Sequence, residues 1–207
     1  MNDSPINLAV LISGGGTTLQ NLIDQIAAGA LKARIVTVIV SRSGIGGIER
    51  AKLAGLPVHV VSRKEFLTID AFSDQIFSIC RDAGVDLICL GGWLQLLRIP
   101  DEWLGRVINI HPSLLPQFGG KGMFGHHVHE AVLKAGCAIS GCTVHFVNNE
   151  YDAGPVILQR ECGVYVGDTP ETLAARVFEE EKAAYPAAIE LWRLGQIRLV
   201  GNRVETR

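Results

Sequence analysis

The stretch INLAVLISGGGTTLQNLID, residues 6–24, decides the fold class. Its first seven residues, Ile6–Ile12, are mostly apolar and run into a serine, three glycines and two threonines. The apolar residues that follow are spaced like one face of a helix: Leu19, Leu22, Ile23 and Ile26. Such a strand–turn–helix passage brings backbone N–H groups and a helix N-terminus together, which is an arrangement that binds phosphate. A tight turn without a ligand is the alternative at this point.

Composition limits the class of partner. The chain has 207 residues, of which 48% are hydrophobic, so it can bury a sizeable core, and we expect a single domain over residues 1–207. The formal net charge is -2 and no long basic run occurs, so the electrostatic footprint of a nucleic-acid or membrane-surface binder is missing. Small-molecule partners are expected instead.

Compartment follows from the termini and the cysteines. The N-terminus has no positive region, and no apolar stretch reaches membrane-spanning length, so a soluble, unexported protein is expected. The five cysteines are an odd number in an otherwise ordinary composition, which is not typical of a disulfide scaffold. A reducing cytoplasm fits these features best.

Apolar, β-branched runs alternate with helix-period stretches over the first half of the chain. The runs predict strands at Ile6–Ile12, Arg34–Val40, Pro57–Val61, Asp86–Gly91 and Arg106–Ile110. The stretches between the first four predict helices near Thr17–Ala28, Gly46–Ala54 and Ile69–Ala83. This alternation is typical of a parallel sheet covered on both faces, so we expect a doubly wound α/β fold with a mostly parallel, Rossmann-like sheet.

The pattern changes in the second half. After a predicted helix near Gly125–Ala135, the segments SGCTVHFVNN (140–149) and GPVILQRECGVYV (154–166) predict two longer strands in an antiparallel extension. A long C-terminal helix is predicted near Pro170–Leu194, because an N-cap candidate precedes a proline at its first position.

Two common nucleotide-binding patterns do not fit. A dinucleotide fingerprint would need glycine at Leu19, and the second predicted strand ends in Ser41-Arg42-Ser43 with no acid to hold a ribose. The P-loop pattern fails because Gly120-Lys121 is followed by Gly122.

The densest chemistry lies further along, in VINIHPSLLPQFGG. Asn109 and His111 stand at the end of a predicted strand with one residue between them, so their side chains lie on the same face. An amide donor and an imidazole can therefore converge on one atom. Asp152 lies in the polar loop between the two late strands, where ordinary turn chemistry is the alternative. Together they predict a carboxylate that orients the imidazole and raises its pKa, an imidazole that handles protons, and an amide that stabilises negative charge.

Five segments resemble one family when taken in order: SGGGTTLQNLI, GGWLQLL, INIHPSLLP, GCTVHFV and DAGPVILQ. They are similar to the phosphoribosylglycinamide formyltransferases, folate-dependent enzymes of purine synthesis. The HPSLLP core is shared with methionyl-tRNA formyltransferase and formyltetrahydrofolate deformylase, whereas the glycine run discriminates. The tRNA enzyme carries an extra nucleic-acid-binding domain for which this chain is too short.

The resemblance implies a role for each matching residue. Its catalytic residues would be Asn109, His111 and Asp152; its ribonucleotide-binding residues would be Gly16, Thr17, Thr18 and Glu181; and its folate-binding residues would be Leu94, Gln95, Leu96, Leu97 and Asn109. The N-terminal half would bind the phosphate and the C-terminal half the folate, with the site between them. An arginine is common where Gln95 stands, and a further folate-binding arginine has no clear match, so Arg63 or Lys64 could substitute for it.

Three features stay open in the sequence. His126, His127 and His129 resemble a metal cluster, but no CxxC accompanies them and formyl transfer needs no metal, so no metal site is expected. Lys121 could reach an anion or be solvated, and His145 could be structural or functional.

The expected activity is transfer of a formyl group from 10-formyltetrahydrofolate, a co-substrate, to the glycine amine of glycinamide ribonucleotide in purine synthesis. A formyltetrahydrofolate hydrolase and a non-catalytic folate- or nucleotide-binding regulator are the alternatives. The sequence leaves the oligomeric state open, and a homodimer is compatible with it.

Overall fold

The computed structural model describes residues 4–207 and divides the chain into two compact units, one ending at Ile108 and one running from Asn109 to Arg207. Hydrogen bonding gives a seven-stranded sheet with the strand order β3-β2-β1-β4-β5-β6-β7 and a separate two-stranded sheet, β8-β9. The expected single domain stays a prediction.

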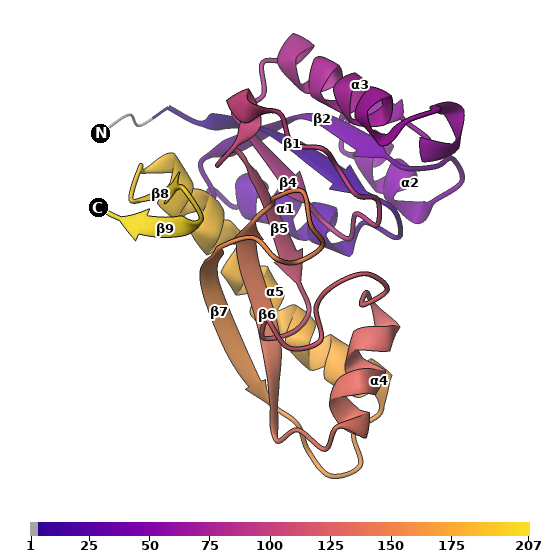
Figure 1. Cartoon of the computed structure of the whole chain (residues 1–207), viewed down its shortest axis with the longest axis vertical. Helices are drawn as coiled ribbons and strands as arrows, with labels where there is room; N and C mark the ends of the chain where they lie inside the picture. Colours follow the sequence, from indigo (N-terminus) through magenta and orange to yellow (C-terminus); the bar gives the residue numbers. More distant parts are fainter. Residues whose placement is uncertain (1–3) are drawn as a thin grey trace. The chain divides into compact units, whose positions relative to one another are not determined.

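The first unit is built on parallel strands. Its elements are β1 (Ile6–Ile12), α1 (Thr17–Ala27), β2 (Ala33–Val40), α2 (Gly46–Leu53), β3 (Val58–Val60), the 3₁₀ turn η1 (Arg63–Glu65), α3 (Ile69–Asp82), β4 (Leu87–Leu90) and the 3₁₀ turn η2 (Asp101–Trp103). Strand β1 pairs in parallel with β2 and β4, and β2 pairs in parallel with β3 (Figure 1).

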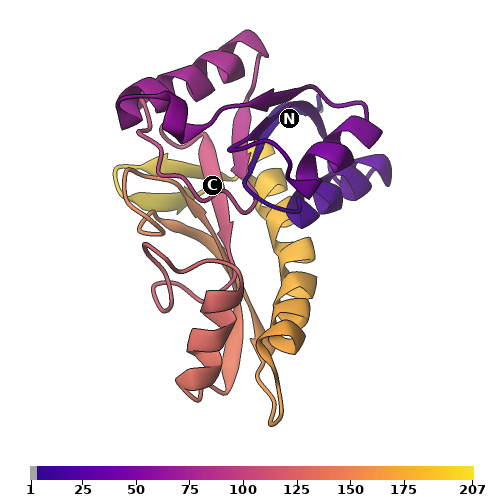
Figure 2. The same cartoon turned by 90° about the vertical axis from the view of Figure 1, so that its right-hand side faces the viewer.

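Helices cover both faces of these strands. The order reverses after β3, so right-handed crossovers place α1 and α2 on one face and α3 on the other, as Figure 2 shows. Burial on both faces explains the nearly continuous apolar sequence of β1, whose residues Leu8–Ile12 are completely buried. From α3, Phe72, Ile76 and Phe77 complete this core.

The second unit begins within β5 (Val107–His111) and continues with α4 (His126–Lys134), β6 (Ile139–Phe146), β7 (Val156–Gly163), α5 (Pro170–Arg193), β8 (Ile197–Val200) and β9 (Arg203–Thr206). Strands β6 and β7 form an antiparallel hairpin, and α5 packs along both of them (Figure 2). Helix α5 starts with a capping box, in which Thr169 and Thr172 exchange hydrogen bonds between side chain and backbone, and Pro170 takes the first helical position.

One glycine fixes how the β6–β7 hairpin closes. A Cβ atom at Gly154 would overlap the carbonyl of Phe146, so only glycine permits this approach of the two backbones. The Asp-Ala-Gly-Pro segment therefore has a packing requirement of its own, independent of any chemistry at Asp152.

The fold class expected from the sequence is confirmed: a doubly wound, mostly parallel sheet, an antiparallel extension and a long C-terminal helix. The β8–β9 hairpin was not predicted. Its strands are joined by Gly201 and Asn202, with a positive φ of 58° at the glycine, and a Gly-Asn pair between short alternating strands is a hairpin signal.

Two further observations concern membrane-spanning helices and the cysteines. Within residues 4–207, no helix combines the length and the apolar character needed to cross a membrane. None of the five cysteines forms a disulfide: Cys80, Cys89 and Cys142 are buried, whereas Cys137 and Cys162 are partly exposed.

Candidate active site

The last residues of β5 carry two of the predicted catalytic side chains. Asn109 and His111 are separated by one residue, so both side chains leave the strand on the same side. His111 is buried, with 3% of its surface exposed, and Asn109 is half-buried. The rest of β5 is buried and apolar, which makes these two polar groups stand out.

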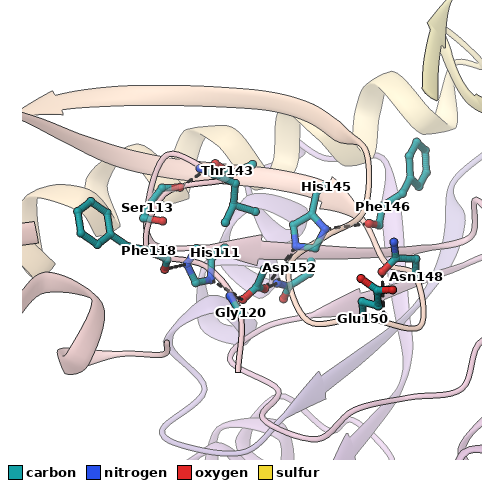
Figure 3. A network of polar contacts seen from close by, with 12 residues as sticks. His111, Ser113, Phe118, Gly120, Thr143, His145, Phe146, Asn148, Glu150 and Asp152 are labelled. Atoms are coloured by element: carbon teal, nitrogen blue, oxygen red, sulfur yellow. Dashed lines mark hydrogen bonds and ion pairs between the residues drawn. The ribbon is translucent and has the colours of Figure 1, made fainter. Parts of the chain in front are cut away.

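Asp152 reaches the same place from the turn between β6 and β7. Its backbone has a positive φ of 53°, a conformation that aspartate tolerates better than most residues. Its Oδ2 accepts a 2.9 Å hydrogen bond from the Gly120 N–H and lies 3.5 Å from His111 Nδ1 (Figure 3). Burial would raise the pKa of Asp152, but its contacts with His145, His111 and the Gly120 N–H outweigh burial and lower it. Asp152 is therefore ionised at neutral pH.

The backbone determines where His111 carries its proton. Its Nε2 lies 2.8 Å from the carbonyl oxygen of Phe118, and a carbonyl only accepts, so Nε2 must donate (Figure 3). The other nitrogen, Nδ1, then faces the Asp152 carboxylate. Phe118 presents its carbonyl from a left-handed conformation with a φ of 54°.

The pKa of His111 reflects two opposing influences. Burial lowers it, and although Asp152 and the Phe118 carbonyl act to raise it, the net result is a pKa below the ordinary 6.5. The expected contribution of Asp152, which raises the pKa, is present, but burial outweighs it. The lowered pKa favours the neutral imidazole at neutral pH.

Asn109 has two partners, one of them not assigned from the sequence. Its Nδ2 lies 3.1 Å from His145 Nε2 and donates over a longer 3.4 Å to Asp152 Oδ1. The three predicted residues thus meet in one network, and His145 of β6 joins them. The only sequence signal for His145 was a polar residue on an apolar strand.

The glycine turn lies in the first unit. Gly16 caps α1 from a left-handed conformation with a φ of 75°, and no side chain caps the helix. A Cβ atom built on Gly14 or Gly15 would have no neighbour within 4 Å, so the backbone there is open. Arg50 of α2 supports the turn, since its Nε donates a 2.8 Å hydrogen bond to the Gly15 carbonyl. The predicted Thr17 and Thr18 begin the helix, and Thr18 is buried.

The predicted folate loop, Leu94–Leu97, follows β4 in the same unit. The Leu94 N–H donates to Ser13 Oγ at 3.0 Å, which ties this loop to the end of β1. Leu94 is exposed, Gln95 and Leu96 are half-buried, and Leu97 is buried. The guanidinium of Arg63 donates to the Phe66 carbonyl at 2.6 Å, whereas Lys64 is exposed, so the structure does not choose between these two residues as a folate ligand.

Glu181 lies on α5 in the second unit. Burial raises the pKa of its carboxyl group to about 7, so the group is close to half-protonated near neutral pH. Such a carboxyl group can donate as well as accept, which suits contact with sugar hydroxyls.

Two of the three histidines of α4 contact acidic side chains. His126 contacts Glu130 at 3.1 Å and Glu171 at 3.5 Å, and His127 contacts Glu130 at 3.4 Å. His129 is buried, and its Nδ1 has no hydrogen-bond partner. Across the described part of the chain, no three histidine, cysteine or acidic side chains form a group that could hold a metal ion. Lys121 is exposed.

The comparison with protein families is decisive. The model of the family described as formyl transferase matches residues 6–189 of this chain. The chain belongs to the formyl transferase family.

Similar members of the formyl transferase family are known from several organisms. The chain is 40% identical over 196 residues to the trifunctional purine biosynthetic protein adenosine-3 of Gallus gallus, an alignment that spans 94% of this chain and 19% of that protein. It is 37% identical over 197 residues to the phosphoribosylglycinamide formyltransferase of Haemophilus influenzae, spanning 94% and 91%. The chain therefore spans only about a fifth of the trifunctional relatives but most of the bacterial one.

A solved structure agrees with the fold. The glycinamide ribonucleotide transformylase 1 of Symbiobacterium toebii superposes with a TM-score of 0.90 at 38% sequence identity, covering 100% of this chain and 95% of that one. The β-strand order and the long C-terminal helix described above are thus those of a formyl transferase.

Proposed function

We propose that this chain transfers a formyl group from 10-formyltetrahydrofolate to the glycine amine of glycinamide ribonucleotide, a step of purine synthesis. The observation that carries the proposal is the network of Asn109, His111 and Asp152 at the end of β5. It occurs in a formyl transferase whose relatives include proteins named for this transfer.

The proposed reaction proceeds by direct attack. The glycine amine forms a bond to the formyl carbon, and negative charge develops on the formyl oxygen. The Asn109 amide stabilises this oxyanion, and His111 becomes a better proton acceptor as the charge forms. The proton lost by the amine passes through Asp152 and His111, directly or through a water, to the folate nitrogen as its bond to the formyl carbon breaks. Proximity of the two substrates supplies much of the rate.

The lowered pKa of His111 suits this sequence of events. A neutral imidazole beside an ionised carboxylate can accept a proton during the reaction and release it again, which a permanently charged imidazolium cannot do. The developing oxyanion supplies the negative charge that favours the protonated form for the lifetime of the intermediate.

The proposal assigns the substrate contacts as follows. The open backbone of the glycine turn, with Gly16, Thr17 and Thr18, binds the ribonucleotide phosphate, and Glu181 binds the ribose. The loop Leu94–Leu97, including Gln95, binds the pteridine, and Asn109 contacts the formyl end of the folate. The domain works on small molecules in the cytoplasm, without a metal, a nucleic acid or a membrane. Its oligomeric state stays open, a homodimer included.

One assay tests the proposal. Release of tetrahydrofolate from 10-formyltetrahydrofolate is followed spectroscopically with and without glycinamide ribonucleotide, for the wild type and for His111→Ala. Release that depends on the ribonucleotide and is lost in the variant is expected. Release at the same rate without the acceptor would show a hydrolase, and no release under either condition would overturn catalysis altogether.

A further inference from the structure

His145 holds a fixed tautomer in the candidate site. It is buried, with 2% of its surface exposed, and its Nδ1 lies 2.8 Å from the carbonyl oxygen of Phe146 (Figure 3). Because a carbonyl only accepts, Nδ1 carries the hydrogen and the Nε2 of a neutral ring presents a lone pair. That lone pair faces Asn109 Nδ2 at 3.1 Å, so His145 accepts an amide hydrogen.

This tautomer determines the orientation of the Asn109 amide, that is, which of its nitrogen and oxygen atoms faces His145. In the observed orientation, Nδ2 faces two acceptors, His145 Nε2 and Asp152 Oδ1. Reversing the amide would place its oxygen against both, and two acceptor–acceptor contacts in a buried site are repulsive. The orientation therefore depends on His145 Nε2, which also lies 3.7 Å from Asp152 Oδ1.

The two hydrogens of the amide are not equivalent. The one toward His145 makes a bond of ordinary length, whereas the one toward Asp152 spans 3.4 Å, which is beyond the usual range of N–H···O bonds. The second hydrogen is thus held weakly and remains available to a better acceptor.

We propose that His145 is a positioning residue for formyl transfer: it anchors one hydrogen of the Asn109 amide and so holds the amide in the plane that presents the other hydrogen to the formyl oxygen as negative charge develops there. The inference rests on the proposed function and adds a residue to it. His145 itself touches neither substrate in this scheme, and acts only through Asn109.

The kinetic test compares two replacements of His145. His145→Gln keeps an acceptor near the position of Nε2, whereas His145→Leu keeps the bulk and removes the acceptor. We expect His145→Leu to lower kcat by about 10²-fold with little change in either KM, because a misplaced catalytic group costs about that much. His145→Gln should recover most of this loss. A loss carried by KM, or a glutamine variant as slow as the leucine variant, would overturn the proposal.

A double variant separates positioning from general disruption. If His145 acts only through Asn109, then His145→Leu combined with Asn109→Ala should be no slower than Asn109→Ala alone, since residues acting as a unit are not additive. Losses that multiply would overturn the proposal. Melting temperatures of all variants, and active-site titration, confine the comparison to folded protein.

An NMR measurement, which needs no turnover, tests the positioning role of His145 separately from the proposed function. Proton–nitrogen NMR of the histidine rings should show His145 with its hydrogen on Nδ1, and the side-chain amide resonances of Asn109 should move in His145→Leu but not in the exposed control His127→Gln. A wild type that binds neither substrate would refute the proposed function and, with it, the role of His145 in formyl transfer, even where the contact between His145 and Asn109 is present. A hydrogen on Nε2 of His145 would refute the positioning role, whatever the activity.

Discussion

Asp152 has two alternative roles: it can simply form the turn between β6 and β7, or it can act with His111 in catalysis. Asp152→Asn keeps the shape and the turn-forming capacity, but removes the charge that faces His111 at 3.5 Å. We expect folding to survive and turnover to fall by about 10²–10⁴-fold, the usual contribution of general acid–base catalysis. The pKa of His111 should fall further, because the carboxylate is the main influence that raises it. Steady-state rates between pH 5 and pH 9 measure both effects.

The control for Asp152 is its combination with His111→Ala. If the two side chains form one unit, the double variant should lose far less than the product of the single losses. Full activity in Asp152→Asn, or losses in turnover that multiply in the double variant, would show that Asp152 only forms the turn and has no catalytic role.

Gly16 offers a test of the glycine turn. Gly16→Ala introduces a side chain at a φ of 75°, and its Cβ would lie 2.9 Å from the Gly47 Cα. The left-handed conformation alone should cost about 1–2 kcal/mol of stability. We also expect weaker ribonucleotide binding with folate binding unchanged, since the phosphate contacts depend on this backbone. Calorimetric titration with both ligands measures the difference.

A matched glycine separates strain from binding. Gly29 has a similar φ of 73°, but a Cβ atom there has no neighbour within 4 Å. Gly29→Ala should therefore carry the cost of the left-handed conformation without the steric overlap, and should leave ribonucleotide binding intact. Equal ribonucleotide affinity in the two alanine variants would contradict phosphate binding at the glycine turn.

Residues of the candidate site could be predicted from the sequence where the type of side chain itself indicates the role. Asn109, His111 and Asp152 could be named from strand ends and loop position, and they do meet. The backbone partners could not, because the carbonyl of Phe118 and the N–H of Gly120 have no side-chain signature. The net direction of the His111 pKa could not be predicted for a related reason: burial, which dominates it, depends on the packing of segments distant in the sequence.

Among the elements, α5 has the best-defined start. The Thr169 side chain accepts from the Thr172 N–H, and Thr172 in turn accepts from the Thr169 N–H. Thr169→Ala should therefore lower the free energy of unfolding by about 1 kcal/mol, a typical loss for an N-cap threonine. Urea denaturation measures the effect, and an unchanged midpoint would show that Pro170 and the surrounding packing suffice to start the helix.

Elements with a long, regular pattern were predictable to within a residue or two. Strand β1 has the predicted bounds, and α3 ends one residue before the predicted end. The hairpin β8–β9 was missed because its strands have four residues each and are mostly exposed, so hydrophobic alternation is weak. Turn chemistry at Gly201 and Asn202 was the stronger signal there.

At the scale of the whole molecule, buried histidines set the response to acid. Burial lowers the pKa of His129 to about 4, with the charges of His126 and His111 adding to the effect. The folded state then binds fewer protons than the unfolded state, so stability falls as the pH drops from 6.5 to about 4 and levels off below that. Across this window the loss from His129 is about 3 kcal/mol.

His129→Met tests this source of acid sensitivity. The replacement removes the titrating ring, and also the buried Nδ1 that lacks a partner. We expect the variant to be at least as stable as the wild type at pH 7.5 and clearly more stable at pH 4.5, because an unsatisfied buried polar atom is costly. Urea midpoints at the two pH values measure this. A parallel decline in both proteins would assign the acid response to other groups.

The distribution of the cysteines gives each unit its own chemical reporter. The first unit contains only the buried Cys80 and Cys89, whereas the second contains the partly exposed Cys137 and Cys162. Burial raises the pKa of Cys162, and alkylating reagents attack the thiolate, so Cys137 should be modified before Cys162 in the folded protein. Cys80 should react only when the first unit opens, and the buried Cys142 only when the second unit opens, because burial raises the pKa of each thiol to about 12. Pulsed alkylation followed by mass spectrometry can therefore time the opening of the two halves separately, without any introduced probe.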